Sequence, residues 1–212
     1  MIIRKASTRG FLDFGWINSF RTFSNNSYWD KNYQRWNRLL VINEDTQMPK
    51  NVVPKHRHFF HDILGYMIEG DLKHWDDLGN IQHATAGQIQ HMFCGKGISH
   101  TEASIGSVPA RYIQIWLRTD REYWQDPPSY ELIQRPETFD VLPIDFKFNG
   151  KIQGGPIIGQ HTLETKSAYI YVIDGTIKGD GFELSKGDGA ELTEDLVADF
   201  DCHLLMFEFF DK

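Results

Sequence analysis

The sequence predicts an all-β fold, a sandwich or a barrel, because it has many short strand-like runs and no helical pattern. Runs of β-branched, aliphatic and aromatic residues recur at short intervals, bounded by Gly, Pro, Asp or Asn, which favour turns. They lie at 39–43, 63–70, 112–117, 168–177 and 204–210. No long window repeats apolar residues at the spacing of an amphipathic helix. Regularly spaced short strands of this kind are typical of antiparallel sandwiches and barrels.

Two segments of the chain resemble each other, which predicts an internal duplication. Residues 65–87 and 169–192 both contain a strand, an acidic residue followed by Gly, a second strand, a Gly-containing turn and a third strand. Their spacing is about the length of one small domain. The segment 118–143 between them is rich in charge and Pro, so we expect a linker there. The sequence therefore predicts an N-terminal domain at 1–125 and a C-terminal domain at 126–212.

The composition fits a globular protein and argues against two classes of partner. The 212 residues are 41% hydrophobic and include 15 Phe and 6 Trp, enough for a packed core. The formal net charge is -7 and no run of Lys or Arg occurs, so we expect no direct binding of nucleic acid. No segment has the apolar length of a signal peptide or a membrane span. We expect a cytoplasmic protein with no membrane partner.

Two pairs of residues carry the pattern that points to chemistry. His56 and His58 form the first pair, and His100 and Glu102 form the second. Residues two apart on a strand project to the same face, so each pair would present two side chains together. If the two strands are neighbours, the four side chains converge.

Three imidazoles and one carboxylate suit a divalent transition metal and are poor ligands for calcium. Four protein ligands would leave a coordination position for water, substrate or oxygen. The competing interpretation is that these are surface or hydrogen-bonded histidines in a chain that has 9 of them. A single His-x-His pair is weak evidence, but two such pairs in a β-rich chain favour a metal site.

The same residues lie in segments that resemble the signature regions of the pirin family. HRHFFHDILGYMIEGDLKHWDDLGN and AGQIQHMFCGKGISHTE resemble its metal-site segments, and FGWINSFRTFSNNSYWD and LLVINED resemble its opening segment. The specific motifs cover roughly residues 10–118, and the remainder matches more loosely through length and duplication. The resemblance implies a bicupin, two small antiparallel β-barrels of jelly-roll type packed together.

The resemblance also implies a ligand set. One divalent metal would be held by His56, His58, His100 and Glu102 in the N-terminal cupin, with Fe(II) as the expected ion and Mn, Ni, Co, Cu or Zn as alternatives. The C-terminal cupin would lack metal ligands. The chain departs from the family pattern at Arg57, Asp62, His91 and the pair Phe93-Cys94, none of which removes a ligand. His91 and Phe93-Cys94 lie close in sequence to the metal-binding strand, so they bear on substrate choice.

Other candidate residues have simpler interpretations. We interpret His74 as part of a polar turn that needs no chemistry, and His61 and His91 as ordinary hydrogen-bonding residues. For these three residues and His83, the alternative is that they orient ligands or substrate. Cys94 is expected to be a small buried residue, and a redox-sensitive thiol is the alternative.

The resemblance leaves two functions open. Some pirins are similar to quercetin 2,3-dioxygenases, which open the central ring of a flavonol with O2 and release carbon monoxide. In such an enzyme Glu102 would be the base that removes a proton from the hydroxyl of a small aromatic substrate. The alternative is a metal-dependent, redox-sensitive regulatory module that binds a protein partner without catalysis. A substrate-sized pocket open to the metal would distinguish the enzyme from the module. A metal-free structural protein would require that the four ligands do not converge.

Overall fold

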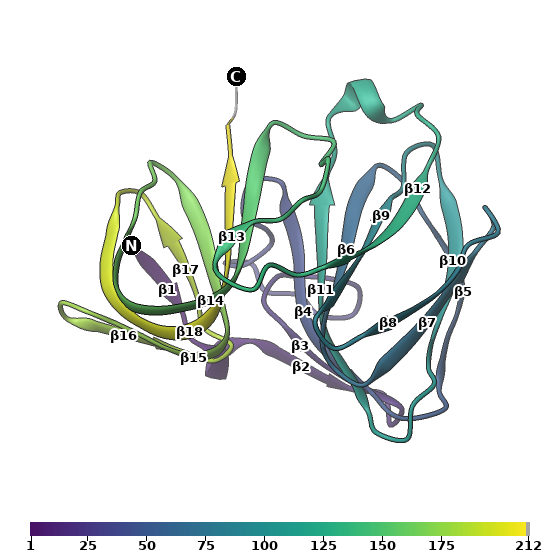
Figure 1. Ribbon diagram of the computed structural model, residues 1–212, viewed down its shortest axis with the longest axis horizontal. Coiled ribbons are helices and arrows are strands. Elements are labelled where there is room, and N and C mark those ends of the chain that lie inside the picture. Colours follow the sequence, from purple (N-terminus) through teal and green to yellow (C-terminus); the bar gives the residue numbers. More distant parts are fainter. Residues whose placement is uncertain (211–212) are drawn as a thin grey trace. The chain divides into compact units, whose positions relative to one another are not determined.

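The computed structural model describes residues 1–210, which form two compact units of antiparallel strands (Figure 1). The N-terminal unit consists of Gly10–Gln134 together with Ile144–Phe148. The C-terminal unit consists of Met1–Arg9, Arg135–Pro143 and the chain from Asn149 onward. The all-β prediction is confirmed, since the only helices among residues 1–210 are two short 3-10 turns, η1 (Ala6–Thr8) and η2 (Arg121–Tyr123).

Two antiparallel sheets build the N-terminal unit. The larger sheet contains, in spatial order, β12 (Ser129–Gln134), β9 (Gln88–Phe93), β6 (His61–Glu69), β11 (Ala110–Arg118), β4 (Leu39–Gln47), β3 (Ile17–Arg21) and β2 (Gly10–Asp13). The smaller sheet contains β5 (Val52–His58), β10 (Ile98–Ser104), β7 (Asp71–Asp76) and β8 (Ile81–Thr85). Residues from different strands and their connections are buried together in apolar clusters, one of which contains Ile63, Met92, Cys94 and Ile98. This packing holds the two sheets as a rigid frame for side chains between them.

One antiparallel sheet builds the C-terminal unit. It contains, in spatial order, β1 (Ile2–Arg4), β17 (Gly189–Leu192), β15 (Ala168–Gly179), β18 (Leu196–Phe209), β14 (Gly150–Leu163) and β13 (Asp140–Val141), with β16 (Phe182–Ser185) paired to β15. In Figure 1 the purple β1 lies among the green and yellow strands of this unit. The sheet encloses its own apolar core, which includes Ile170, Val172, Phe200 and Leu204.

The duplicated segments place a glycine at the same bend in each unit. Gly70 joins β6 of the larger sheet to β7 of the smaller one with a φ of 73°, and Gly175 bends β15 with a φ of 83°. A Cβ at Gly70 would lie 2.5 Å from the carbonyl oxygen of Pro109, and one at Gly175 would lie 2.1 Å from that of Asp201. Only glycine fits both the left-handed conformation and the close backbone. The acidic residue followed by Gly in the sequence repeat therefore marks the point where a strand turns.

The segment predicted to be a linker, 118–143, contains a strand of the N-terminal unit. Residues 129–134 form β12, which pairs with β9 along its length, so the linker prediction is wrong there. Tyr130 and Leu132 alternate with exposed neighbours, a short strand pattern that the flanking prolines obscured. The contacts also group β1 with the C-terminal unit, through its pairing with β17, and not with the residues that follow it.

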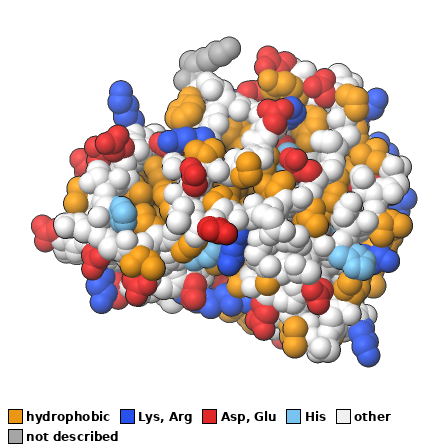
Figure 2. Space-filling view, in the orientation of Figure 1, with side chains coloured by type: hydrophobic (Ala, Val, Ile, Leu, Met, Phe, Trp, Pro, Cys, Tyr) orange, Lys and Arg blue, Asp and Glu red, His pale blue; other side chains and the backbone are white. Residues whose placement is uncertain are grey.

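Charged side chains of both signs are dispersed over the face seen in Figure 2, in keeping with a formal net charge of -7. Among the helices within residues 1–210, none has the length and apolar character needed to cross a membrane.

A buried histidine joins three strands of the larger sheet. The ring of His91 on β9 lies 2.8 Å from Asp62 Oδ1 on β6 and 2.8 Å from Glu131 Oε1 on β12. The second oxygen of Asp62 accepts a hydrogen bond from the backbone N–H of Lys147 at 2.9 Å. Burial lowers the pKa of His91, but the hydrogen bonds and charges of the two carboxylates outweigh it and raise the pKa overall. His91, one of the departures from the family pattern, therefore links strands within this unit.

We predict that this histidine makes stability depend on pH. A group whose pKa is raised in the folded state stabilises fully below its ordinary pKa of 6.5 and loses that effect as the pH rises through the folded value. The free energy of unfolding of wild type should exceed that of His91→Gln by about 1–3 kcal/mol at low pH. Urea unfolding between about pH 5 and pH 9 checks whether the difference shrinks at the alkaline end. A difference that grows with pH would contradict the assignment.

Candidate metal centre

Three histidine rings meet where β5 and β10 pair. The antiparallel register sets His100 directly opposite His56, and His58 lies two residues along β5 on the same face. The ring centroids of His56 and His58 are 4.7 Å apart, and those of His56 and His100 are 4.4 Å apart. A ring nitrogen from each of the three lies within 4.8 Å of the others. This is the spacing of side chains that share one metal ion.

Glu102 lies next to this cluster but is not one of its members. A register shift between His100 and Glu102 sets Glu102 opposite Val53, so that β5 has one extra residue there, next to Pro54. The extra residue lies on β5, so His100 and Glu102 keep the regular alternation of β10. Glu102 instead groups with His74 and His100, whose ligand atoms also lie within 4.8 Å of one another. The structure therefore brings together three of the four predicted ligands and places the fourth beside them.

The protonation state of the three histidine rings suits the binding of a cation. Burial, followed by the neighbouring histidine charges, lowers the pKa of His58 and of His100 to about 3, so both are neutral imidazoles at physiological pH. His56 Nδ1 lies 2.8 Å from the carbonyl oxygen of Pro54, which can only accept, so that nitrogen carries the proton. The lone pair of His56 Nε2 therefore faces His100 Nε2, 3.1 Å away. Neutral nitrogen lone pairs converging in this way are what a divalent transition metal requires.

Burial raises the pKa of the Glu102 carboxyl, partly opposed by the charges of His74 and His56 and by Gln90. Gln90 Nε2 lies 3.5 Å from Glu102 Oε1, and the hydroxyl of Tyr130 donates to Gln90 Oε1 at 2.8 Å. The carboxylate is thus held in a dry environment that favours taking up a proton.

A cavity of about 640 Å³ adjoins the cluster, and His56, His58 and Glu102 are among the residues that line it. Its walls include the aromatic side chains of Phe14, Trp16, Tyr112 and Trp116. The volume lies within the range of pockets that bind small organic molecules. Phe14 and Trp16 of the opening segment thus contribute to this cavity.

The opposite wall of the cavity is a polar face of the larger sheet. Antiparallel pairing sets Asp45 of β4 between Ser19 and Tyr112, and sets Asn43 between Arg21 and Gln114. Burial, opposed in part by Ser19 and Arg21, raises the pKa of Asp45 to about 6. Three buried atoms on this wall have no hydrogen-bond partner among the described residues: Asn43 Oδ1, Asp45 Oδ1 and Trp116 Nε1.

His74 belongs to the site, and the polar turn that the sequence favours for it is not its main surrounding. Its side chain is buried and lies 3.4 Å from His100, measured between the two Nδ1 atoms. The signal was present in the alternation of β7, where Leu72 and His74 are both buried and therefore face inward.

The other candidate residues have structural surroundings. His61 packs near Trp116, with ring centroids 5.8 Å apart. His91 faces Asp62 and Glu131, on the side of β9 opposite Gln90. Cys94 is fully buried, and burial raises the pKa of its thiol, which disfavours a reactive thiolate.

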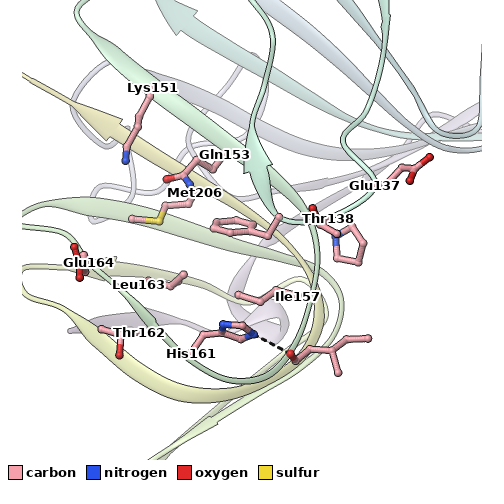
Figure 3. A pocket seen from close by; sticks show the side chains of 13 residues that line it. Glu137, Thr138, Lys151, Gln153, Ile157, His161, Thr162, Leu163, Glu164 and Met206 are labelled. Carbon is pink, nitrogen blue, oxygen red and sulfur yellow. Dashed lines mark hydrogen bonds between the residues drawn. The ribbon is translucent and has the colours of Figure 1, made fainter.

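A second cavity, of about 680 Å³, lies in the C-terminal unit (Figure 3). Ile157, Leu163 and Met206 supply buried apolar wall, and Lys151 and Glu164 are among its charged lining residues. His161 points to the backbone, because its Nε2 donates to the carbonyl oxygen of Ile158 at 2.8 Å. Among residues 1–210, both groupings of three potential metal ligands lie in the N-terminal unit. That the C-terminal unit binds no metal stays a prediction.

Comparison with known proteins agrees with this arrangement. The family model described as Pirin matches residues 3–117. The chain is 28% identical to a quercetin 2,3-dioxygenase of Escherichia coli over 97% of each protein, and 29% identical to a pirin-like protein of Caulobacter vibrioides over 93% of each. The crystal structure of the bacterial pirin YhhW from Escherichia coli in complex with nickel(II) matches with a TM-score of 0.88 and 26% identity, covering 98% of this chain and 97% of that one. The predicted bicupin fold is confirmed, and a divalent metal is supported.

We predict that metal retention depends on the three histidines. Chain loaded with Ni²⁺ and desalted should carry about one metal per chain, and His56→Ala and His100→Ala should each lose most of it, because each removes a ligand from a small set. Elemental analysis measures the ratio, with His161→Ala in the C-terminal cavity as the matched control. Equal retention in all the variants would show that the metal lies elsewhere.

Proposed function

Because the chain belongs to the pirin family, we propose that it is a metal-dependent dioxygenase of the quercetin 2,3-dioxygenase type, acting on a flavonol or a similar enolic molecule. The observation that carries the proposal is the 640 Å³ cavity that reaches His56, His58 and Glu102. A docking module needs no such cavity beside its metal, whereas an enzyme does. The relative in Escherichia coli, named a quercetin 2,3-dioxygenase, supports the same reaction class.

The metal that the histidines would hold supplies a Lewis acid for a substrate hydroxyl and a place to bring O2 to it. Fe(II) remains the expected ion, and Ni(II) is supported by the solved relative. Both atoms of O2 enter the products as one carbon leaves as carbon monoxide, so the reaction requires no external reductant. The tasks left to the chain are to hold the substrate, to accept its proton and to exclude water.

Glu102 is suited to accept that proton. It is 7% exposed, it lines the cavity, and burial raises its pKa, which makes the carboxylate a stronger base than one in water. Glu102 lies beside the three rings and groups with His74 and His100. A carboxylate that does not need to stay bound to the metal is free to receive the proton.

The polar wall supports a hydroxylated aromatic substrate. Aromatic side chains on the cavity wall suit a flat ring. Asn43 and Asp45 offer buried acceptor oxygens without protein partners, which suit hydroxyl donors on that ring. A site of this kind discriminates strongly against an analogue that lacks the hydroxyl, because its buried polar groups are then left unpaired.

We predict that Glu102→Gln abolishes turnover and leaves the metal bound. The substitution keeps shape but removes the base, so kcat should fall by roughly 10²–10⁴. Oxygen consumption and carbon monoxide release with a flavonol panel measure turnover, and elemental analysis confirms metal content. If wild type carries one metal and turns over no flavonol of the panel, the result favours the protein-binding module or another substrate.

We predict that Asp45 recognises a substrate hydroxyl. Asp45→Ala should raise KM for a hydroxylated substrate by about 10- to 150-fold, the equivalent of a charged hydrogen bond of about 1.5–3 kcal/mol. Asp45→Asn, which keeps an acceptor oxygen, should raise KM by a smaller factor. Steady-state kinetics with a substrate pair that differs in one hydroxyl make the comparison, and an unchanged preference in Asp45→Ala would rule out this role.

A further inference from the structure

We propose that Asp76 and His74 form a hydrogen-bonded chain behind His100 that holds the proton on His100 Nδ1 and turns His100 Nε2 toward the metal. His74 is then a positioning residue, which touches neither metal nor substrate. The proposal rests on the metal role proposed above, and it adds a second layer to that site.

The chain is built by the pairing of β7 with β10. The register sets Asp76 opposite His100 and His74 opposite Glu102. His74 Nδ1 lies 3.4 Å from His100 Nδ1, and His74 Nε2 lies 2.9 Å from Asp76 Oδ2. The three groups thus lie in line, on the side of His100 away from His56.

The direction of each hydrogen bond follows from what each atom can do. Asp76 already accepts from the backbone N–H groups of Leu78 and Asn80 and from the side-chain amide of Asn80, so it acts as an acceptor. His74 Nε2 therefore carries the proton and donates to Asp76. With its proton on Nε2, the His74 imidazole has its lone pair on Nδ1, which accepts from His100 Nδ1–H. The lone pair of His100 is left on Nε2, which faces His56.

The His74 ring is also held in the orientation that its hydrogen bond with His100 needs. Its ring stacks on Tyr130 of β12, with centroids 4.0 Å apart and an angle of 16° between the planes. The side chain is 1% exposed, and the cavity beside it measures about 10 Å³, room for one water molecule at most. The stack on Tyr130 opposes rotation of the His74 ring. The small cavity leaves little room for water to replace His74 as the partner of His100.

Asp76 and His74, hydrogen-bonded in series behind His100, change how His100 binds a metal. They raise the basicity of the coordinating nitrogen and remove the entropy of ring rotation, and loss of such partners weakens metal binding by about 10- to 100-fold. The turn at Asp76, Leu78 and Asn80 therefore also orients the Asp76 carboxylate toward His74.

His74 also has an alternative role, as a ligand itself, because its ligand atom groups with those of His100 and Glu102. The two roles differ in what a substitute must provide. A relay needs an acceptor at the position of Nδ1, which an Asn side chain offers through Oδ1. A ligand needs an imidazole.

The first test needs no metal. In the metal-free chain the lone pair of His56 Nε2, 3.1 Å from His100 Nε2, competes for the His100 proton, so the test uses His56→Ala, which removes this acceptor. Imidazole ¹⁵N NMR of His56→Ala, assigned by adding His74→Phe or His100→Gln, reports which ring nitrogen carries each proton. We expect the Nδ1–H form of His100 and the Nε2–H form of His74, with the His100 preference lost when His74→Phe is added. An Nε2–H form of His100 in His56→Ala would overturn the proposal.

The second test measures Ni²⁺ affinity by competition with a chelator. His74→Phe keeps the stack on Tyr130 but has no acceptor, and it should weaken binding about 10- to 100-fold. His74→Asn should recover most of that loss, and His83→Phe, at an exposed position of β8, should bind as wild type does. Wild-type affinity in His74→Phe, or equal losses in His74→Phe and His74→Asn, would overturn the relay. No stoichiometric binding by wild type would instead defeat the proposed metal function, while the NMR result would still stand.

Discussion

The antiparallel register of β5 and β10, which sets His56 directly opposite His100, is the constraint on which the rest of the site depends. It brings two ring nitrogens to 3.1 Å, and the alternation of β5 adds His58 on the same face. Because β5 is an edge strand, it tolerates Pro54, whose carbonyl fixes the proton on His56. Beside that proline β5 has one extra residue, so Glu102 lies opposite Val53, and it groups with His74 and His100.

The pairing of β10 on its other edge is the second constraint on the site. The same strand that pairs with β5 pairs on its other edge with β7, so residues behind the histidines come from a different part of the chain. Asp76, His74 and Tyr130 occupy that side, and the cavity occupies the other. The site therefore has a dry, hydrogen-bonded back and an open front lined by aromatic and polar groups. That division suits an ion that must be held firmly on one side and approached by substrate on the other.

The sequence predicts the strand content, the duplication and the residues of the histidine cluster, because these depend on periodicity of two and on residue type. What it could not predict depends on pairing between distant strands. The role of His74 requires the knowledge that β7 lies beside β10, and the position of Glu102 requires the bulge opposite it. Strand β12 was hidden because prolines on both sides of Tyr130 and Leu132 resemble a linker. His91 shows the same limit, since only the fold places Asp62 and Glu131 on either side of it.

The central claim is that one metal ion lies among His56, His58 and His100. Diffraction from Ni²⁺-loaded crystals, collected on both sides of the nickel absorption edge, locates the ion without reference to activity. We expect a single strong anomalous peak within coordination distance, about 2.0–2.2 Å, of a nitrogen of each of the three rings, with Glu102 beside it. A peak at another place in the chain, or one held by His74 and Glu102 without His56 and His58, would contradict the account.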